Sequence, residues 1–153
     1  MADTSLSEKK IGLLVWQVSN LWQNRLRKIL KLSNITLNEY LIMESIIDLQ
    51  KSNNLISQNI VSFFSGIDVS VTSVILKMLE NKRFIKREIN DDNRKKTIIM
   101  LSAGKKIFED IYPKIKIEEQ EIFEKLQSEQ NNFKNSLKLV LGKKIRVRAD
   151  YNI

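Results

Sequence analysis

The chain has 153 residues, of which 42% are hydrophobic and 29% are charged, with four glycines and one proline. This length and composition are typical of one helical domain with its own core, and they exclude a disordered chain. The absence of cysteine and histidine excludes disulfides, thiolate and imidazole metal sites, and hydrolysis by a serine-histidine pair. We therefore expect no enzyme, no metal and no cofactor.

The net charge is +8, from 26 basic and 18 acidic residues. A basic protein of this size commonly binds an anionic polymer, because its cations displace the counterions of phosphates. An AT-rich genome, which favours Lys, Asn and Ile, accounts for the same charge without nucleic acid. Near the N-terminus, "IGLLVW" is too short for a signal or a membrane span. We expect a cytoplasmic protein without a membrane partner.

Capping signals mark the first two helices. Ser5 and Glu8 have the spacing of a capping box, and apolar residues at helical spacing continue this helix to about residue 32. A second box, Thr36 with Glu39, opens a helix that extends through Leu49. Short helices at residues 57–64 and 69–81 follow, separated by the turn "SGID". That order is typical of a helix-turn-helix.

Two strands are expected next, at residues 84–89 and 97–101. The turn residues "NDDNR" between them predict a hairpin, with Arg94, Lys95 and Lys96 at its bend. A two-stranded hairpin must pack on other elements, and directly after a helix-turn-helix it fits the role of a wing that contacts the DNA backbone or minor groove. A surface hairpin with solvated charges is the alternative.

The C-terminal third is predicted to be two helices. Ser102 can cap a long helix, in which Pro113 removes one hydrogen bond and favours a kink. Ser128 can cap a last helix, which Gly142 closes. The chain shows no internal repeat and no interdomain linker, so we interpret it as a single domain.

Part of the sequence resembles a known family. The stretch "VTSVILKMLENKRFIKR", followed by "DNR" and a glycine-bearing helix start, is similar to the MarR family of winged helix-turn-helix transcriptional regulators. The likeness is strongest at Leu79 with Glu80, at Ile85 and Arg87, and in the pair of Asp92 and Arg94. The order of elements agrees along nearly the whole chain.

The resemblance implies a mainly α fold with a small β-hairpin. It places the winged helix-turn-helix at residues 36–101 and dimerisation helices at residues 1–35 and 102–153 of a single domain. It further implies a homodimer on double-stranded DNA, with an inverted-repeat operator, and in many family members a cavity for a small-molecule effector. We expect a repressor, because a dimer on a promoter excludes polymerase. The alternative is a dimeric interaction or ligand-sensing protein without specific DNA binding.

Two departures from the family pattern concern turns. The family usually has glycine where Arg83 stands, so we expect Asn81 or Lys82 to make the turn at the end of the recognition helix, residues 69–81. The family's Leu-Thr-x-x-Gly after the wing is here "MLSAG". Either Met100 and Leu101 fill its first two positions or one residue is deleted, and the start of the long helix stays open.

The family register assigns the two faces of the recognition helix. It buries Thr72, Ile75, Leu76 and Leu79, and it presents to DNA Ser70, Ser73, Val74 and Lys77. Hydroxyls bind phosphates or bases, valine contacts a thymine methyl, and lysine binds a phosphate or guanine. Ser70 can instead cap the helix, and Val74 can instead belong to the core. Asp92 is interpreted as orienting Arg94, because phosphates repel a carboxylate.

Three aromatic residues in the predicted dimerisation helices are candidates for the wall of an effector cavity: Trp16, Trp22 and Phe123. Their rings can line an effector cavity, but packing in the core or at an interface is the simpler interpretation. We assign no ligand-binding residues and no catalytic residues.

Overall fold

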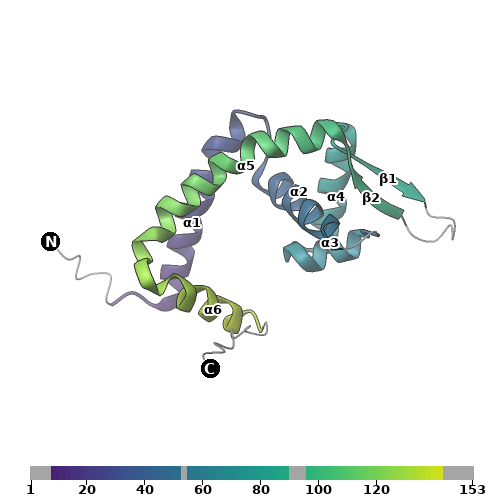
Figure 1. Ribbon diagram of the computed structural model, residues 1–153. Helices are drawn as coiled ribbons and strands as arrows, with labels where there is room; N and C mark the ends of the chain where they lie inside the picture. Colours follow the sequence, from purple (N-terminus) through teal and green to yellow (C-terminus); the bar gives the residue numbers. More distant parts are fainter. Residues whose placement is uncertain (1–7, 53–54, 90–95, 143–153) are drawn as a thin grey trace, which may run out of the picture. The chain divides into compact units, whose positions relative to one another are not determined.

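The computed structural model describes residues 8–52, 55–89 and 96–142, which contain helices and one hairpin (Figure 1). In chain order the elements are α1 (Ile11–Lys31), α2 (Leu37–Gln50), α3 (Gln58–Ser65), α4 (Val69–Asn81), β1 (Ile85–Ile89), β2 (Lys96–Met100), α5 (Ser102–Phe123), the 3-10 helix η1 (Glu124–Glu129) and α6 (Gln130–Val140). The chain forms two compact units, residues 1–116 and 117–153, and α5 belongs to both. Each unit is described by itself.

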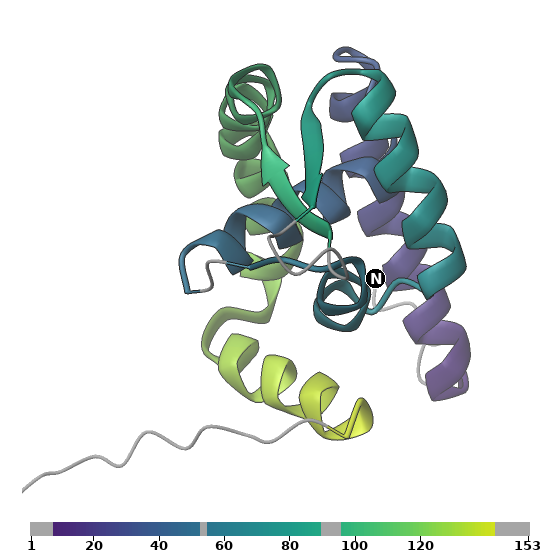
Figure 2. The same ribbon diagram turned by 90° about the vertical axis from the view of Figure 1, so that its right-hand side faces the viewer.

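The first unit is built around α2. Figure 2 shows this helix among α3, α4 and the hairpin. Eight of its 14 residues are buried, which requires apolar neighbours on more than one side. The core of this unit comprises Leu26, Leu30, Ile35, Leu37, Tyr40, Ile42, Met43, Ile46, Leu49, Ile56, Val61, Ile75, Leu76, Leu79, Ile85, Ile98, Phe108, Ile111 and Ile115.

The capping box of α2 is confirmed. The Thr36 hydroxyl accepts a hydrogen bond from the Glu39 amide, and the Glu39 carboxylate accepts one from the Thr36 amide. The start predicted for α1 is wrong: this helix begins at Ile11, after Lys10, and Glu8 precedes it. Ser5 lies outside the described residues. Capping-box spacing alone did not locate this end.

The hairpin pairs β1 with β2 in antiparallel register, with Ile85 opposite Met100 and Ile89 opposite Lys96. The backbone joins it to its neighbours as well. The Ile98 amide donates to the Ile56 carbonyl over 2.8 Å, just before α3, and the Leu101 amide donates to the Phe84 carbonyl over 2.9 Å. The first bond therefore attaches the middle of β2 to the segment before α3, and the second closes the base of the hairpin.

The long helix α5 begins at Ser102, which is its first residue and not its cap. Its first turn lies against the start of β1, because a Cβ atom added to Gly104 would be only 2.4 Å from the Phe84 carbonyl oxygen. Farther along α5, the Phe108 ring stacks on Tyr40 of α2 at a centroid distance of 5.5 Å. These contacts attach the first half of α5 to the lobe, which is the part of the first unit made of α1, α2, α3, α4 and the hairpin.

The second unit contains the end of α5, η1 and α6. Gln127 has non-helical angles (φ 50°, ψ −123°) within η1, and the prediction that Ser128 caps the last helix is wrong, because Ser128 lies in η1 and α6 begins at Gln130. Gly142 has φ 72° just after α6, in agreement with its predicted closing role. The Phe123 and Phe133 rings lie 6.3 Å apart.

Candidate nucleic-acid interface

The two faces of α4 have the burial that the family register implies. Its buried residues are Thr72, Ile75, Leu76 and Leu79. All four candidate DNA-binding residues of this helix are exposed: Ser70, Ser73, Val74 and Lys77. Val74 has 60% of its surface exposed, so the alternative that it belongs to the core of the chain is wrong. These four side chains offer two hydroxyls, two methyl groups and one ammonium group.

The turn before α4 is held by side chains that bond to one carbonyl. Ser62 and Thr72 both donate hydroxyl hydrogen bonds to the Ile67 carbonyl, at 2.6 and 3.2 Å. Asp68 occupies the cap position of α4, and its carboxylate accepts a 2.5 Å hydrogen bond from the Ser70 hydroxyl. The alternative role of Ser70 as the helix cap is therefore wrong. Its hydroxyl lies at the exposed start of α4.

The end of α4 shows how the chain turns without the glycine usual in the family. Arg83 itself adopts the left-handed conformation, with φ 61°. The Phe84 amide donates to the Leu79 carbonyl over 3.0 Å, and the Arg83 amide donates to the Glu80 carbonyl over 2.9 Å, which is the usual pattern of a left-handed helix end. The expectation that Asn81 or Lys82 makes this turn is wrong.

Of the candidate wing residues, Lys96 alone lies within the described part of the chain. It is exposed at the start of β2. Asp92, Arg94 and Lys95 lie outside the described residues, so their predicted roles remain predictions. A hollow of about 660 Å³ lies between the start of α3 and the hairpin, and both Lys96 and Arg87 line it.

Arg87 takes part in an interaction that sequence reasoning missed. Its guanidinium group forms an ion pair with Glu80 of α4 and donates to the Gln58 side chain of α3 over 3.4 Å. The side chain is mostly buried, with 18% exposed. One residue of β1 therefore joins the wing to both helices of the helix-turn-helix. The family likeness marks Arg87, but neither sequence spacing nor charge identifies its partners.

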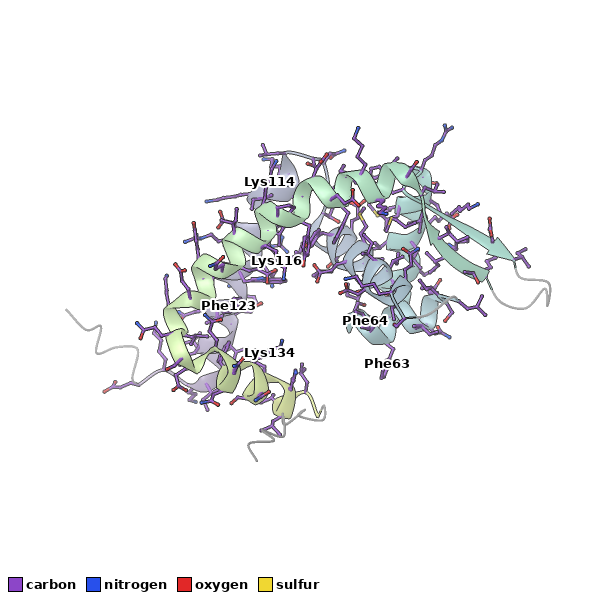
Figure 3. The ribbon with its side chains drawn as sticks, viewed as in Figure 1. Phe63, Phe64, Lys114, Lys116, Phe123 and Lys134 are labelled. Atoms are coloured by element: carbon purple, nitrogen blue, oxygen red, sulfur yellow. The ribbon has the colours of Figure 1, made fainter. Side chains whose placement is uncertain are left out.

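The three aromatic residues considered for a cavity differ in their surroundings. Trp16 is exposed on α1, whereas Trp22 packs against the core of the first unit. Phe123 lies in the second unit, where it lines a hollow of about 240 Å³ together with Leu126, Gln130, Phe133, Lys134 and Leu137. Phe123 and Lys134 are labelled in Figure 3. The packing interpretation holds for Trp22.

The described residues offer neither a cluster of metal ligands nor a single membrane-spanning helix. Within residues 8–52, 55–89 and 96–142, no group of three or more acidic side chains is placed to hold a metal ion. None of the helices in these ranges has by itself the length and apolar composition of a membrane span. Taken together, α3 and α4 have that length and apolar composition, but the chain bends by 114° between them.

Comparison with known proteins supports the fold. No protein-family model matches the chain. The chain is 24% identical over 98 residues to YdcH of Bacillus subtilis (strain 168), described as an uncharacterized HTH-type transcriptional regulator; the match covers 63% of this chain and 67% of that protein.

Several solved structures are similar to the chain over more of its length than YdcH is. MepR of S. aureus in complex with DNA has a TM-score of 0.78 at 21% identity, covering 87% of this chain and 95% of MepR. A MarR variant of E. coli complexed with operator DNA has a TM-score of 0.76 at 20% identity, covering 92% and 99%. CouR of Rhodococcus jostii bound to p-coumaroyl-CoA has a TM-score of 0.77 at 18% identity, covering 95% and 100%. The chain has the winged helix-turn-helix fold of MarR-family regulators, as the sequence predicts.

Proposed function

We propose that the chain is a sequence-specific, DNA-binding transcriptional regulator that acts as a dimeric repressor. The observation that carries this proposal is the exposed face of α4, where Ser70, Ser73, Val74 and Lys77 are exposed while the opposite face is buried. A helix held in this way can enter a major groove and present short side chains to the base edges. The fold shared with two DNA-bound regulators supports the same function.

Each candidate residue has a chemical role in this proposal. The hydroxyls of Ser70 and Ser73 bind bases or phosphates, Val74 contacts a thymine methyl, and Lys77 binds a phosphate or a guanine edge. In the wing, Arg94, Lys95 and Lys96 contact the DNA backbone or minor groove, and Asp92 orients Arg94. Phosphate contacts hold the protein in register, while α4 reads the sequence.

Dimer formation is supported by the apolar side chains that a single chain leaves exposed. On α1 they include Ile11, Val15 and Trp16, and on α6 they include Leu139 and Val140. Large exposed apolar patches commonly mark an interface. We propose that the helices at residues 1–35 and 102–153 form a homodimer with two-fold symmetry, so that the operator is an inverted repeat. Light scattering at micromolar concentration should give the mass of two chains.

A small-molecule effector is a further part of the proposal. CouR, which shares the fold, was solved with p-coumaroyl-CoA bound. A ligand that binds the DNA-free conformation more tightly would release the repressor by shifting the population. We propose that such a regulator acts in the cytoplasm. Its only chemistry would be binding, so we propose no catalytic, metal or cofactor site.

One observation favours a second function. The DNA-facing side of α4 carries a single cation, Lys77, and no arginine, although arginine to guanine is the commonest specific base contact. The second candidate is therefore a dimeric interaction or ligand-sensing protein without specific DNA binding. Such a protein would have the same fold and the same exposed apolar helices.

Selection of bound sequences from a random duplex pool separates the two functions. A repressor should enrich an imperfect inverted repeat with half-sites about one helical turn, roughly 10 base pairs, or a small multiple apart. Its affinity for the selected duplex should fall with salt, because phosphate contacts release counterions. Enrichment of no sequence, with weak binding of all duplexes alike, would instead support the interaction protein.

A further inference from the structure

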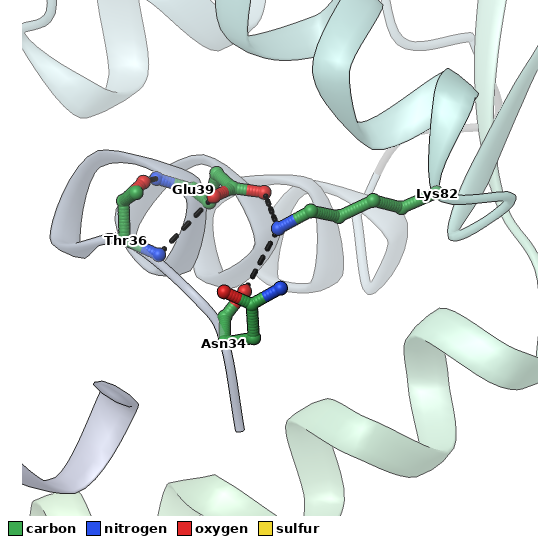
Figure 4. A network of polar contacts seen from close by, with 4 residues as sticks. All are labelled: Asn34, Thr36, Glu39 and Lys82. Atoms are coloured by element: carbon green, nitrogen blue, oxygen red, sulfur yellow. Dashed lines mark hydrogen bonds and ion pairs between the residues drawn. The ribbon is translucent and has the colours of Figure 1, made fainter. Parts of the chain in front are cut away.

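A buried carboxylate joins the start of α2 to the end of α4 (Figure 4). Glu39 has only 1% of its side chain exposed. One carboxylate oxygen accepts a 3.1 Å hydrogen bond from the Thr36 amide, and the other lies 2.8 Å from the Lys82 ammonium nitrogen. Lys82 also donates over 2.8 Å to the Asn34 carbonyl. Lys82 therefore contacts both the turn between α1 and α2 and the first turn of α2.

The position of Lys82 in the chain makes this contact significant. It is the C-cap residue of α4, directly before Arg83 in its left-handed conformation, and β1 begins at Ile85. The recognition helix thus passes into the wing at this point. The Asn34 carbonyl is 48 residues earlier in the sequence. The contact therefore links the two DNA-facing elements to the first two helices of the lobe.

The capping box does not require Lys82, because Thr36 and Glu39 complete it by themselves. The lysine has a different effect, which is to neutralise a carboxylate that water does not reach. A buried carboxylate without a counter-ion is very unfavourable. Any displacement of α4 that separates Lys82 from Glu39 is therefore opposed more strongly than a small slip between apolar side chains. The direction of such a displacement matters as well, because the Lys82 ammonium must stay within reach of both the Glu39 carboxylate and the Asn34 carbonyl.

We propose that Lys82 is a positioning residue for DNA reading, which fixes the tilt of α4 through Glu39 and Asn34. This inference rests on the proposed function. A helix of 13 residues is about 20 Å long, so a tilt of roughly 5° at its end moves its start by about 1.7 Å. Base contacts by Ser70 and Ser73 tolerate about 0.5 Å. Loss of the Lys82 contact should therefore impair sequence discrimination, although Lys82 lies at the opposite end of α4.

Two simpler roles for Lys82 predict different behaviour. If Lys82 bound a DNA phosphate, its loss would weaken binding to every sequence and reduce the salt slope by about one unit or less. If the ion pair only stabilised the fold, its loss would lower the free energy of unfolding and leave the preference of the folded protein unchanged. A positioning role lowers the preference for operator over random DNA at an unchanged salt slope.

The variants are chosen to separate the charge from the cap. Lys82→Met removes the ammonium and keeps the aliphatic stem. Glu39→Gln removes the negative charge and keeps an amide oxygen for the Thr36 amide, so the capping box remains. The double variant has neither charge, and it leaves no buried carboxylate unpaired if Lys82→Met alone folds poorly. Lys82→Arg keeps a cation, and Lys51→Met is the control because it removes the exposed ion pair with Asp48.

The measurement is the affinity of each full-length variant for the selected operator and for random duplex, over a series of salt concentrations. Circular dichroism and sizing verify that each variant is folded and has the wild-type mass. We expect Lys82→Met to lower the operator preference by roughly 5- to 10-fold, at the low end of coupling between distant sites. The double variant should lose no more than Lys82→Met alone, since the two residues act as a pair. Lys82→Arg should recover most of the preference, and Lys51→Met should change nothing.

Three outcomes would overturn the inference. A folded double variant with wild-type operator preference would show that the pair does not position α4. Equal losses on operator and random duplex, with a lower salt slope, would make Lys82 a phosphate contact. Wild-type protein without any operator preference would refute the proposed function itself and the inference with it. Only in the first two outcomes does the proposed function survive.

Discussion

The helices α2 and α6 bury their apolar residues to very different extents. Eight of the 14 residues of α2 are buried, whereas none of the 11 residues of α6, all of which the structure describes, is buried. Leu139 and Val140 of α6 are among the exposed apolar side chains. The winged helix-turn-helix therefore closes its core within one chain. The second unit, in contrast, leaves apolar surface that a partner chain can cover.

The α1 helix combines both behaviours. Leu26 and Leu30, near its end, are buried in the core of the first unit, while Ile11 and Trp16, near its start, are exposed. Its C-terminal part therefore stabilises the lobe, and its N-terminal part is available for association. Substitutions test this contrast, because the same change should act on unfolding in one region and on dimer formation in the other.

The largest expected effect is that of Leu76→Ala compared with Leu139→Ala. Leu76 is fully buried in the lobe, so its truncation should lower the free energy of unfolding by about 2 to 5 kcal/mol through lost burial and a cavity. Leu139 is exposed, and its truncation should leave the unfolding of the lobe nearly unchanged and weaken the dimer. Urea denaturation measures the first effect, and dilution in light scattering measures the second. Equal destabilisation by both variants would contradict the contrast.

A smaller effect is expected of Gly104→Ala. The added Cβ would meet the Phe84 carbonyl oxygen at 2.4 Å and the Met100 sulfur at 2.7 Å. Backbone cannot give way as a flexible side chain can, so the start of α5 must shift, at a cost of about 1 to 3 kcal/mol. Gly12→Ala is the matched control in α1, where a Cβ has no neighbour within 4 Å. Thermal unfolding should show a loss for Gly104→Ala alone.

Arg83→Gly should stabilise the protein. Arg83 has φ 61°, a conformation that costs a non-glycine residue roughly 1 to 2 kcal/mol. Glycine removes this strain but gains entropy in the unfolded chain, so we expect a net gain of about 1 kcal/mol or less. Lys51→Gly is the control, because Lys51 is the C-cap residue of α2 with φ −68° and glycine should not help there. A loss of stability in Arg83→Gly would show that the arginine side chain contributes more than its backbone costs.

Sequence signals predicted the elements of the lobe well, and they failed at the ends of terminal segments. The helix at residues 69–81 was predicted with its observed bounds, because the turn "SGID" precedes it and strand-forming residues follow it from Phe84. At Ser128 only a local capping signal was available. No residue of η1 or α6 is buried among those the structure describes, so burial gives no independent indication of where the last helix starts.

The candidate site shows a similar division. The exposed face of α4 could be assigned only from the family resemblance, because apolar residues cover more than half of the circumference between Val69 and Leu79 and leave two possible core faces. The ion pairs of Lys82 with Glu39 and of Arg87 with Glu80 could not be assigned. The fold, and not sequence spacing, brings Lys82 beside Glu39, and a chain with 26 basic and 18 acidic residues offers many alternative pairs.

In the proposed function, α4 reads the DNA sequence while the wing contacts the DNA backbone. One experiment compares operator and random duplex binding by Val74→Ser and Arg94→Ala, with Ser52→Ala, at an exposed position after α2, as the control. Val74→Ser should lower the operator preference by on the order of 1 kcal/mol and leave the salt slope unchanged. Arg94→Ala should weaken binding to all sequences and reduce the salt slope by about one unit or less. If both folded variants keep wild-type affinity, preference and salt slope, neither α4 nor the hairpin contacts DNA as proposed.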